Sequence, residues 1–158
     1  MALRTILTQE DDTLRKTARA VDRFDRRLHV LLDDMADTLH RADGAGLAAP
    51  QVGVLRRAVV IDTGDDELLE LINPVILRTE VVQEGPEGCL SVPGRYGVVK
   101  RPMTVTIRAQ DRKGRFFERT GEALLARAFC HEVDHLDGKL FTVLVSRWLD
   151  PEKDKDYF

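Results

Sequence analysis

The longest regular pattern of apolar positions lies in residues 25–41. Asp25 is a residue type that caps helix N-termini, and Asp43-Gly44 is a common way to end a helix. Between them, five apolar residues recur at intervals of three and four and would form one stripe: Leu28, Leu31, Leu32, Met35 and Leu39. The pattern predicts an amphipathic helix from about Asp25 to Arg41, with this stripe facing the core.

Short segments of β-type pattern follow. The segments expected as strands are 57–62, 68–72, 75–77, 98–100 and 104–109. Residues 111–114 are expected to form a hairpin turn, after which residues 115–119 run back along the preceding strand. Asn73-Pro74 is expected to separate two of these strands. Segment 44–51 is too small and too rich in Gly and Pro for a regular element, and segment 84–94 is interrupted by the same residue types.

A second helix is predicted from about Gly121 to Leu136, with Gly138 as its C-terminal stop, and residues 140–145 are expected as a last strand. The order is therefore helix, many strands, helix and short strand. Segregation of this kind indicates an α+β fold with mostly antiparallel sheets packed around the second helix. We expect one domain over residues 1–158, with a charged, solvated tail from about residue 150.

Charge and length narrow the class of protein. The chain has 158 residues, with 24 Lys and Arg against 27 Asp and Glu, and its net charge is −3. This balance argues against direct DNA binding, and no apolar run approaches the about 18 residues of a membrane span. The N-terminus turns acidic too early for a secretory signal, so a cytoplasmic location is expected. The basic pairs are expected in solvated loops and strand ends: Arg56-Arg57, Lys100-Arg101 and Arg112-Lys113.

The predicted second helix carries candidate chemistry. His131-Glu132-Val133-Asp134-His135 has the pattern HExxH. Residues four apart share one face of a helix, so the two imidazoles can bind one metal ion. Glu132 could then reach a water molecule that the metal makes acidic, and could take and return its proton. Because the pattern also arises by chance, its meaning depends on a third ligand.

Several residues can be compared as that third ligand. Phe141 stands where the extended metalloprotease pattern has its histidine, and most of the downstream acids lie in the charged tail. On the helix, Cys130 would point about 100° away from His131. Cys89 lies among glycines and prolines, and a thiolate with two imidazoles leaves one position of a tetrahedral metal open for water. Since disulfides are rare in a reducing compartment, we favour Cys89 as a ligand over a disulfide partner.

Segment Gly44–Gln51, GAGLAAPQ, has two interpretations. It could be a connector of small residues packed under the sheet. Alternatively, its small residues could let the backbone approach a substrate, and Gln51 could donate a hydrogen bond to a developing oxyanion. A phosphate-binding loop is excluded, because no Gly-Lys-Ser/Thr follows.

Taken together, these motifs resemble one family, the peptide deformylases. The resemblance rests on GxGLAAxQ at 44–51, EGCLS at 87–91, SVPGRYG at 91–97 and HExDH followed by LDG at 131–138, in the family's order. It covers nearly the whole chain and is closest to the bacterial form. The chain departs from the commoner pattern at Cys130, where many members have Gln, at residues 8–15, where a Pro-containing start is replaced, and in its short C-terminus.

The resemblance implies a metal-dependent hydrolase that removes the N-terminal formyl group from formylmethionyl nascent polypeptides and releases formate. Carried over position by position, Cys89, His131 and His135 hold the metal. Water attacks the formyl carbon, with Glu132 as general base and acid. The metal implied is Fe²⁺, one per chain, which Zn²⁺, Ni²⁺ or Co²⁺ can replace. The resemblance also implies a contact with the ribosome. We expect the protein to be a monomer.

Other roles also come from the resemblance. It assigns the tetrahedral oxyanion to the Gln51 side chain and the Leu90 backbone N–H. It gives Gly46 a backbone hydrogen bond to the substrate. It places three further residues near the methionine side chain: Ala45, Gly88 and Cys130.

Two other functions remain open on the residues alone. The first is a metallopeptidase or another metal amidase that uses the same helix, and the third ligand Cys89 and the missing histidine at Phe141 speak against it. The second is a folded interaction domain whose metal is only structural, and Glu132 speaks against it.

Overall fold

The computed structural model describes residues 2–65 and 67–158. This part of the chain contains two α-helices, α1 (Arg26–Ala42) and α2 (Leu124–Leu136). Its strands are β1 (Gly46–Ala48), β2 (Ala58–Ile61), β3 (Leu69–Cys89), β4 (Val92–Gln110), β5 (Phe116–Glu122) and β6 (Arg147–Leu149). Short 3₁₀-helices are η1 (Asp12–Arg15), η2 (Ala49–Val52), η3 (Phe141–Leu144) and η4 (Lys155–Tyr157). The α+β prediction is confirmed.

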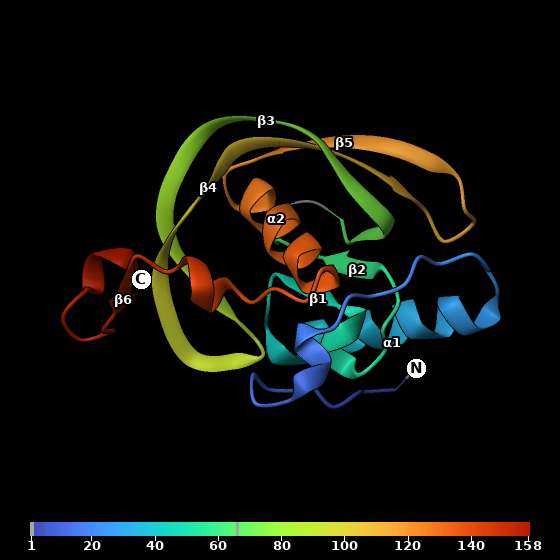
Figure 1. Ribbon diagram of the computed structural model, residues 1–158, viewed down its shortest axis with the longest axis horizontal. Coiled ribbons are helices and arrows are strands. Elements are labelled where there is room, and N and C mark those ends of the chain that lie inside the picture. Colours follow the sequence, from blue (N-terminus) through green and yellow to red (C-terminus); the bar gives the residue numbers. More distant parts are fainter. Residues whose placement is uncertain (1, 66) are drawn as a thin grey trace.

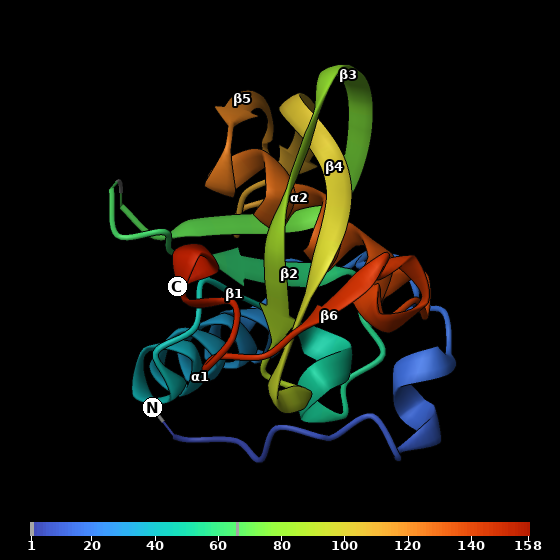
Figure 2. The same ribbon diagram turned by 90° about the vertical axis from the view of Figure 1, so that its left-hand side faces the viewer.

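The strands form one antiparallel sheet in the order β1-β2-β3-β4-β5, and β6 pairs with the first part of β4. Figure 1 shows β3, β4 and β5 arching over α2, while β1 and β2 lie between α2 and α1. Figure 2 shows the long β3–β4 ribbon from the side, with β6 beside it. The sheet thus wraps around the helix that carries the HExxH pattern. Among the described residues, neither α-helix has the length and apolar character needed to cross a membrane.

Helix α1 begins and ends where the sequence predicts. The Asp25 carboxylate accepts a hydrogen bond from the Leu28 N–H at 3.2 Å, and Asp43 ends the helix in the left-handed conformation. All five residues of the predicted stripe are buried. They pack against one face of β1 and β2 in a cluster that includes Leu47, Ala58 and Val60. Burial of this stripe holds α1 under the sheet.

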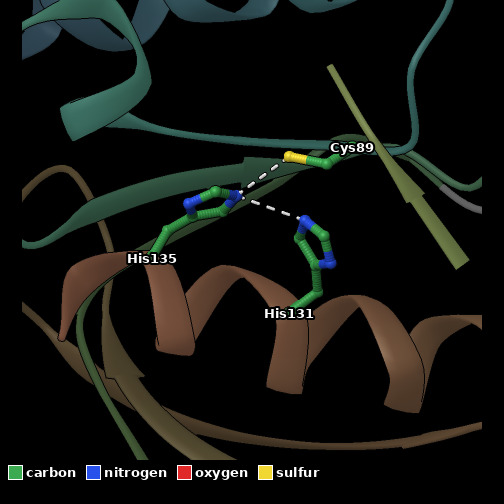
Figure 3. Close-up of side chains that lie close together, drawn as sticks. All are labelled: Cys89, His131 and His135. Atoms are coloured by element: carbon green, nitrogen blue, oxygen red, sulfur yellow. Dashed lines mark hydrogen bonds between the residues drawn. The ribbon is translucent and has the colours of Figure 1, made fainter. Parts of the chain in front are cut away.

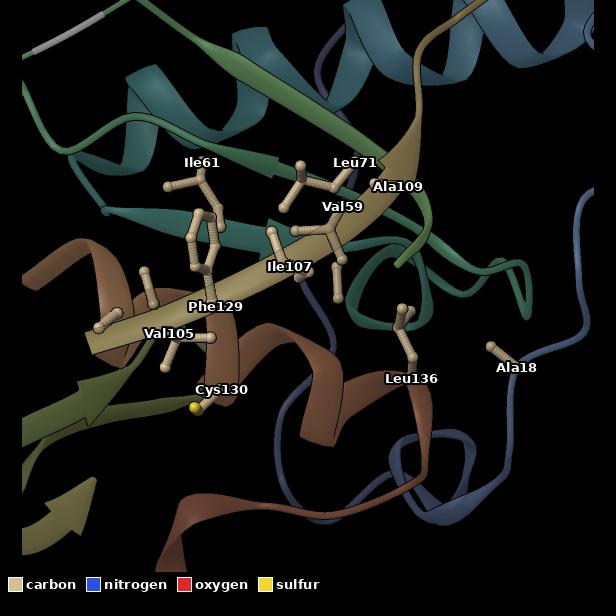
Figure 4. Packing of buried hydrophobic residues seen from close by; sticks show 13 residues of the cluster. Ala18, Val59, Ile61, Leu71, Val105, Ile107, Ala109, Phe129, Cys130 and Leu136 are labelled. Atoms are coloured by element: carbon tan, nitrogen blue, oxygen red, sulfur yellow. The ribbon is translucent and has the colours of Figure 1, made fainter. Parts of the chain in front are cut away.

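Helix α2 occupies the second core, on the opposite face of the sheet. Phe129, with no exposed surface, packs there against Val59, Ile61 and Ile107 (Figure 4). Because neighbouring residues of a strand point to opposite faces, Val59 and Ile61 of β2 face α2, whereas Ala58 and Val60 face α1. The two faces of β2 therefore pack against different helices, and this packing holds α2 in position against the sheet.

Several predicted boundaries were wrong. Asn73-Pro74 does not break the strand: β3 runs through it with a register shift, and the Asn73 side chain bonds both backbone groups of Val21. Segment 44–51, expected to be irregular, forms β1 and η2, and residues 84–94 lie largely within β3 and β4. Residues 140–145 contain η3 rather than a strand, and the last strand, β6, starts at Arg147. A bulge absorbs the extra residues at Asn73, and pairing with β2 makes 46–48 extended.

One arginine of each basic pair differs from expectation, while Arg56, Lys100 and Lys113 are exposed as expected. Arg101 is buried and forms ion pairs with Glu87 and Asp134. Arg57 pairs with Asp137. Arg112 pairs with two acids, Asp33 and Glu70. These arginines tie elements together instead of extending into solvent.

Candidate metal centre

Helix α2 presents two buried imidazoles on one face. His131 and His135 are one turn apart, and their Nε2 atoms are 3.2 Å from each other. The exposed fractions are 7% for His131 and 1% for His135. Since α2 is fixed by core packing on its other side, both rings are held in place by the fold.

Cys89 reaches the same point from the end of β3. Its Sγ lies 3.3 Å from the His135 Nε2, and one donor atom from each of the three residues lies within 4.8 Å of the others (Figure 3). β3 ends at Cys89 in a tight connection to β4, with Cys89 opposite Val92. This turn directs the thiol toward α2. The fold therefore brings together the three residues that the sequence singles out as metal ligands.

The donor set fits a divalent transition metal. A thiolate and imidazoles are ligands that zinc and neighbouring first-row metals share. The Nδ1 of His131 bonds Glu87, which leaves its Nε2 facing the other two donors. Burial lowers the pKa of His135 well below its ordinary value, which favours its neutral imidazole. At His131 burial also acts to lower the pKa, but the contacts with Cys89, Glu132 and Glu87 outweigh it and raise the pKa.

A buried charged network orients His131. The Glu87 carboxylate lies 2.6 Å from the His131 Nδ1, accepts hydrogen bonds from Arg101 at 2.7 and 3.0 Å, and accepts one from Arg127 at 2.9 Å. Arg101 also donates to Asp134 on α2 at 2.8 Å. Burial alone would raise the pKa of Glu87, but the bonds from His131 and Arg101 hold it well below its ordinary value. A carboxylate behind a ligating histidine fixes its ring orientation.

Sequence reasoning missed this network, because the pattern of β4 does not mark Arg101 as buried. Buried and exposed positions do not alternate regularly around it: Met103 is 40% exposed, whereas Thr106 is 4% exposed. A buried charge needs a buried partner, and the sequence pattern does not show which acid supplies it.

Glu132 lies beside the three donors with an incomplete hydrogen-bond set. Its side chain is buried, and its Oε1 has no hydrogen-bond partner. Burial raises its pKa from 4.5 to about 7. A Cβ placed on Gly46 would lie 2.5 Å from the Glu132 Oε2, so the backbone of β1 packs directly on the carboxylate. A buried acceptor without a partner is costly unless a ligand or water completes it.

Gln51 is fixed by three contacts at the edge of the site. Its Oε1 accepts a hydrogen bond from the Ala48 N–H at 2.9 Å. Its Nε2 donates to the Ser91 Oγ at 3.0 Å and lies 3.6 Å from the Cys89 Sγ. The amide N–H group therefore lies next to the thiol, in the region where the sequence analysis expects a donor for an oxyanion.

A cavity of about 400 Å³ opens beside these groups. Most residues that the sequence analysis proposed for substrate contact line it, together with part of the metal centre: Ala45, Gly46, Gly88, Cys89, Leu90, His131 and Glu132. Gln51, His135 and Cys130 do not line it. The Cys130 thiol packs in the core cluster with Phe129 and Val105, and burial raises its pKa to about 11.

The chain is similar to proteins of one family. The sequence profile described as Polypeptide deformylase matches residues 3–149. Peptide deformylase of Caldicellulosiruptor bescii is 56% identical over 97% of this chain and 92% of that protein. A crystal structure of a peptide deformylase from Legionella pneumophila has a TM-score of 0.87 and 46% identity over 98% of this chain and 90% of that chain. One from Synechococcus elongatus, in complex with actinonin, has a TM-score of 0.87 and 42% identity over 90% of this chain and 78% of that chain.

Proposed function

The chain belongs to the polypeptide deformylase family, and on that premise we propose which of its residues carry out the reaction. The protein is a hydrolase that removes N-formyl groups, and it has a Cys/His/His metal site. The substrates are formylated nascent peptides. The observation that carries the assignment of roles is the convergence of Cys89, His131 and His135 beside the unpartnered carboxylate of Glu132.

We assign the metal ligands to Cys89, His131 and His135. The native ion in this proposal is Fe²⁺, and Zn²⁺, Ni²⁺ or Co²⁺ can take its place, since a mixed sulfur and nitrogen donor set suits all four. When bound, the ion supplies a Lewis acid that makes water nucleophilic near neutral pH. Glu87 keeps the His131 ring in the ligating orientation through its hydrogen bond to Nδ1.

Glu132 moves the proton. Its pKa of about 7, raised by burial, lets the carboxylate accept a proton from water and then return it to the amine that leaves. The reaction consumes one water molecule and yields formate and a free α-amine.

The remaining groups hold the substrate. The Gln51 amide and the Leu90 backbone N–H stabilise the oxyanion, where each such donor contributes about 10²- to 10³-fold to the rate. Gly46 pairs with the substrate backbone, and Ala45 and Gly88 adjoin the methionine side chain in the cavity. Cys130 has no part in this proposal, because its thiol is packed in the core. Contact with the ribosome stays a prediction from the family alone. A monomeric state and a cytoplasmic location stay predictions as well.

One experiment tests these assignments. The protein is purified without oxygen, its metal content per chain is measured, and formate release is followed on formyl-Met-Ala-Ser. Glu132→Gln keeps the volume of the side chain but removes its base, so turnover should fall by about 10²- to 10⁴-fold while metal stays bound. Glu84→Gln, an exposed position on β3, is the matched control and should retain full activity.

Three results would contradict the proposal. Cleavage of an internal peptide bond without formate release would favour a metallopeptidase. Full turnover by Glu132→Gln would remove Glu132 from the reaction. Loss of metal in Glu132→Gln would show that the side chain supports the site rather than the proton transfer.

A further inference from the structure

Tyr96 forms one wall of the cavity next to the metal centre. It lies on β4 directly opposite Gly88 of β3, one residue before Cys89, and both Tyr96 and Gly88 line the cavity. A Cβ placed on Gly88 would lie 2.6 Å from the Tyr96 Cε1. The tyrosine ring thus fills the space that a side chain at residue 88 would take. Any movement of this ring changes the shape of the cavity beside Cys89.

Phe158 supports the ring of Tyr96. The two ring centroids are 5.2 Å apart and the planes meet at 83°, an edge-to-face arrangement. Aromatic pairs of this geometry are favourable beyond the apolar area that they bury. Both rings are partly exposed, at 39% for Tyr96 and 58% for Phe158. Without Phe158, the Tyr96 ring would have solvent beside it and could turn away from Gly88.

The chain after β6 is folded so that Phe158 returns to Tyr96. β6 pairs with β4, with Leu149 opposite Tyr96. The Asp154 carboxylate then accepts hydrogen bonds from the Arg147 guanidinium at 3.0 Å and from the Asp150 N–H at 2.8 Å. The charged tail expected to be solvated is largely exposed, but these bonds close it into a turn. The turn leads through η4 to Phe158.

We propose that Phe158 is a positioning residue for deformylation, which holds Tyr96 as a fixed wall of the cavity and thereby sets how tightly the substrate side chain is bound there. The inference rests on the proposed function. It assigns a role in substrate binding to the segment after β6, which lies outside the family motifs at 44–51, 87–97 and 131–138. Phe158 does not contact the metal donors, so its effect falls on substrate binding rather than on proton transfer.

The test compares Phe158→Ala with wild type on formyl-Met-Ala-Ser. We expect KM to rise by roughly 2- to 10-fold, the range of an aromatic pair, while kcat stays within twofold. The ratio of kcat/KM between formyl-Met and formyl-Phe peptides should also fall, because a mobile wall admits a larger side chain. Phe158→Tyr keeps the ring and should restore both values. Tyr96→Ala should shift KM in the same direction, and adding Phe158→Ala to it should change little more.

Phe116→Ala is the matched control. Phe116 is a phenylalanine of similar exposure, 62%, on β5, and it does not line the cavity. The inference is overturned if Phe158→Ala, like Phe116→Ala, has the KM and the side-chain preference of the wild type. It is also overturned if the effects of Tyr96→Ala and Phe158→Ala on KM are additive in the double variant. If the wild-type protein releases no formate from any formylated peptide, the proposed function itself fails, which is a different and recognisable outcome.

Discussion

Adding one methyl group at Gly46 should disable the enzyme through Glu132. In Gly46→Ala the new Cβ would lie 2.5 Å from the Glu132 Oε2 and 3.0 Å from its Cδ. Ordinary contact begins at 3.4 Å, so the carboxylate oxygen must retreat by about 0.9 Å. Glu132 is buried, which leaves the displaced side chain little room.

The expected loss follows from this displacement. A misplacement of about 1 Å in a catalytic group can cost about 10²-fold in rate, which is about 2.7 kcal/mol of activation free energy. Overpacking should also lower the free energy of unfolding by about 1–3 kcal/mol. The backbone N–H and carbonyl of residue 46 remain, so KM should change less than kcat. Metal content should be preserved, because the three atoms nearest to the new Cβ all belong to Glu132 and none to a metal ligand.

The assay measures kcat for formate release at saturating formyl-Met-Ala-Ser, with metal per chain measured on the same samples. Gly85→Ala is the control, since a Cβ there would meet only the Arg127 side chain at an ordinary 3.5 Å. If Gly46→Ala has nearly wild-type kcat, Gly46 acts only through its backbone, and the proposed packing of β1 on Glu132 is wrong.

Three further predictions can be checked separately. Glu87→Gln should weaken metal binding by about 10- to 100-fold in a chelator competition, because Glu87 orients His131, and unchanged affinity would refute that role. Hydrogen bonds from the Ala2 N–H and from Arg4 lower the pKa of Asp34. The contribution of Asp34 to stability is therefore complete above about pH 4 and is lost as the pH falls through the folded pKa. The difference in Tm between wild type and Asp34→Asn should shrink in acid, and a constant difference would contradict this prediction. The iron-loaded enzyme should lose activity in air through oxidation of the Cys89 thiolate or the metal, whereas the zinc-loaded form should keep more, and equal survival of both would count against iron as the vulnerable species.

Local patterns were sufficient to predict both helices, although α2 begins at Leu124, three residues after the predicted start at Gly121, which belongs to β5. The α1 stripe and its Asp25 cap depend on residues within one or two turns of each other, and the structure has both. Strand boundaries were less accurate, because they depend on pairing partners far away in sequence. Asn73-Pro74 has the local composition of a break, yet pairing with β2 and β4 carries β3 through it. The polar side chain of Asn73 bonds Val21, which the local pattern does not reveal.

Some residues of the candidate site could be predicted from local patterns in the sequence, and others could not. Cys89, His131 and His135 could be recognised because their residue types and motifs point to metal binding, and the fold brings them together. The arginines behind them could not, because Arg101 and Arg127 resemble ordinary surface charges until their shared partner is known. Tyr96 lies in the SVPGRYG stretch, but its partner Phe158 lies in no motif, and their contact depends on the turn after β6.

The separation of the donors along the chain has a consequence for folding. Cys89 ends β3 and the histidines lie on α2, with β4 and β5 between them, so the three atoms meet only after the sheet has closed around the helix. An unfolded chain offers no equivalent binding site, and each tenfold rise in free metal above the dissociation constant should therefore favour the native state by about 1.4 kcal/mol. A cell starved of the ion would hold a polypeptide that is both idle and easier to denature.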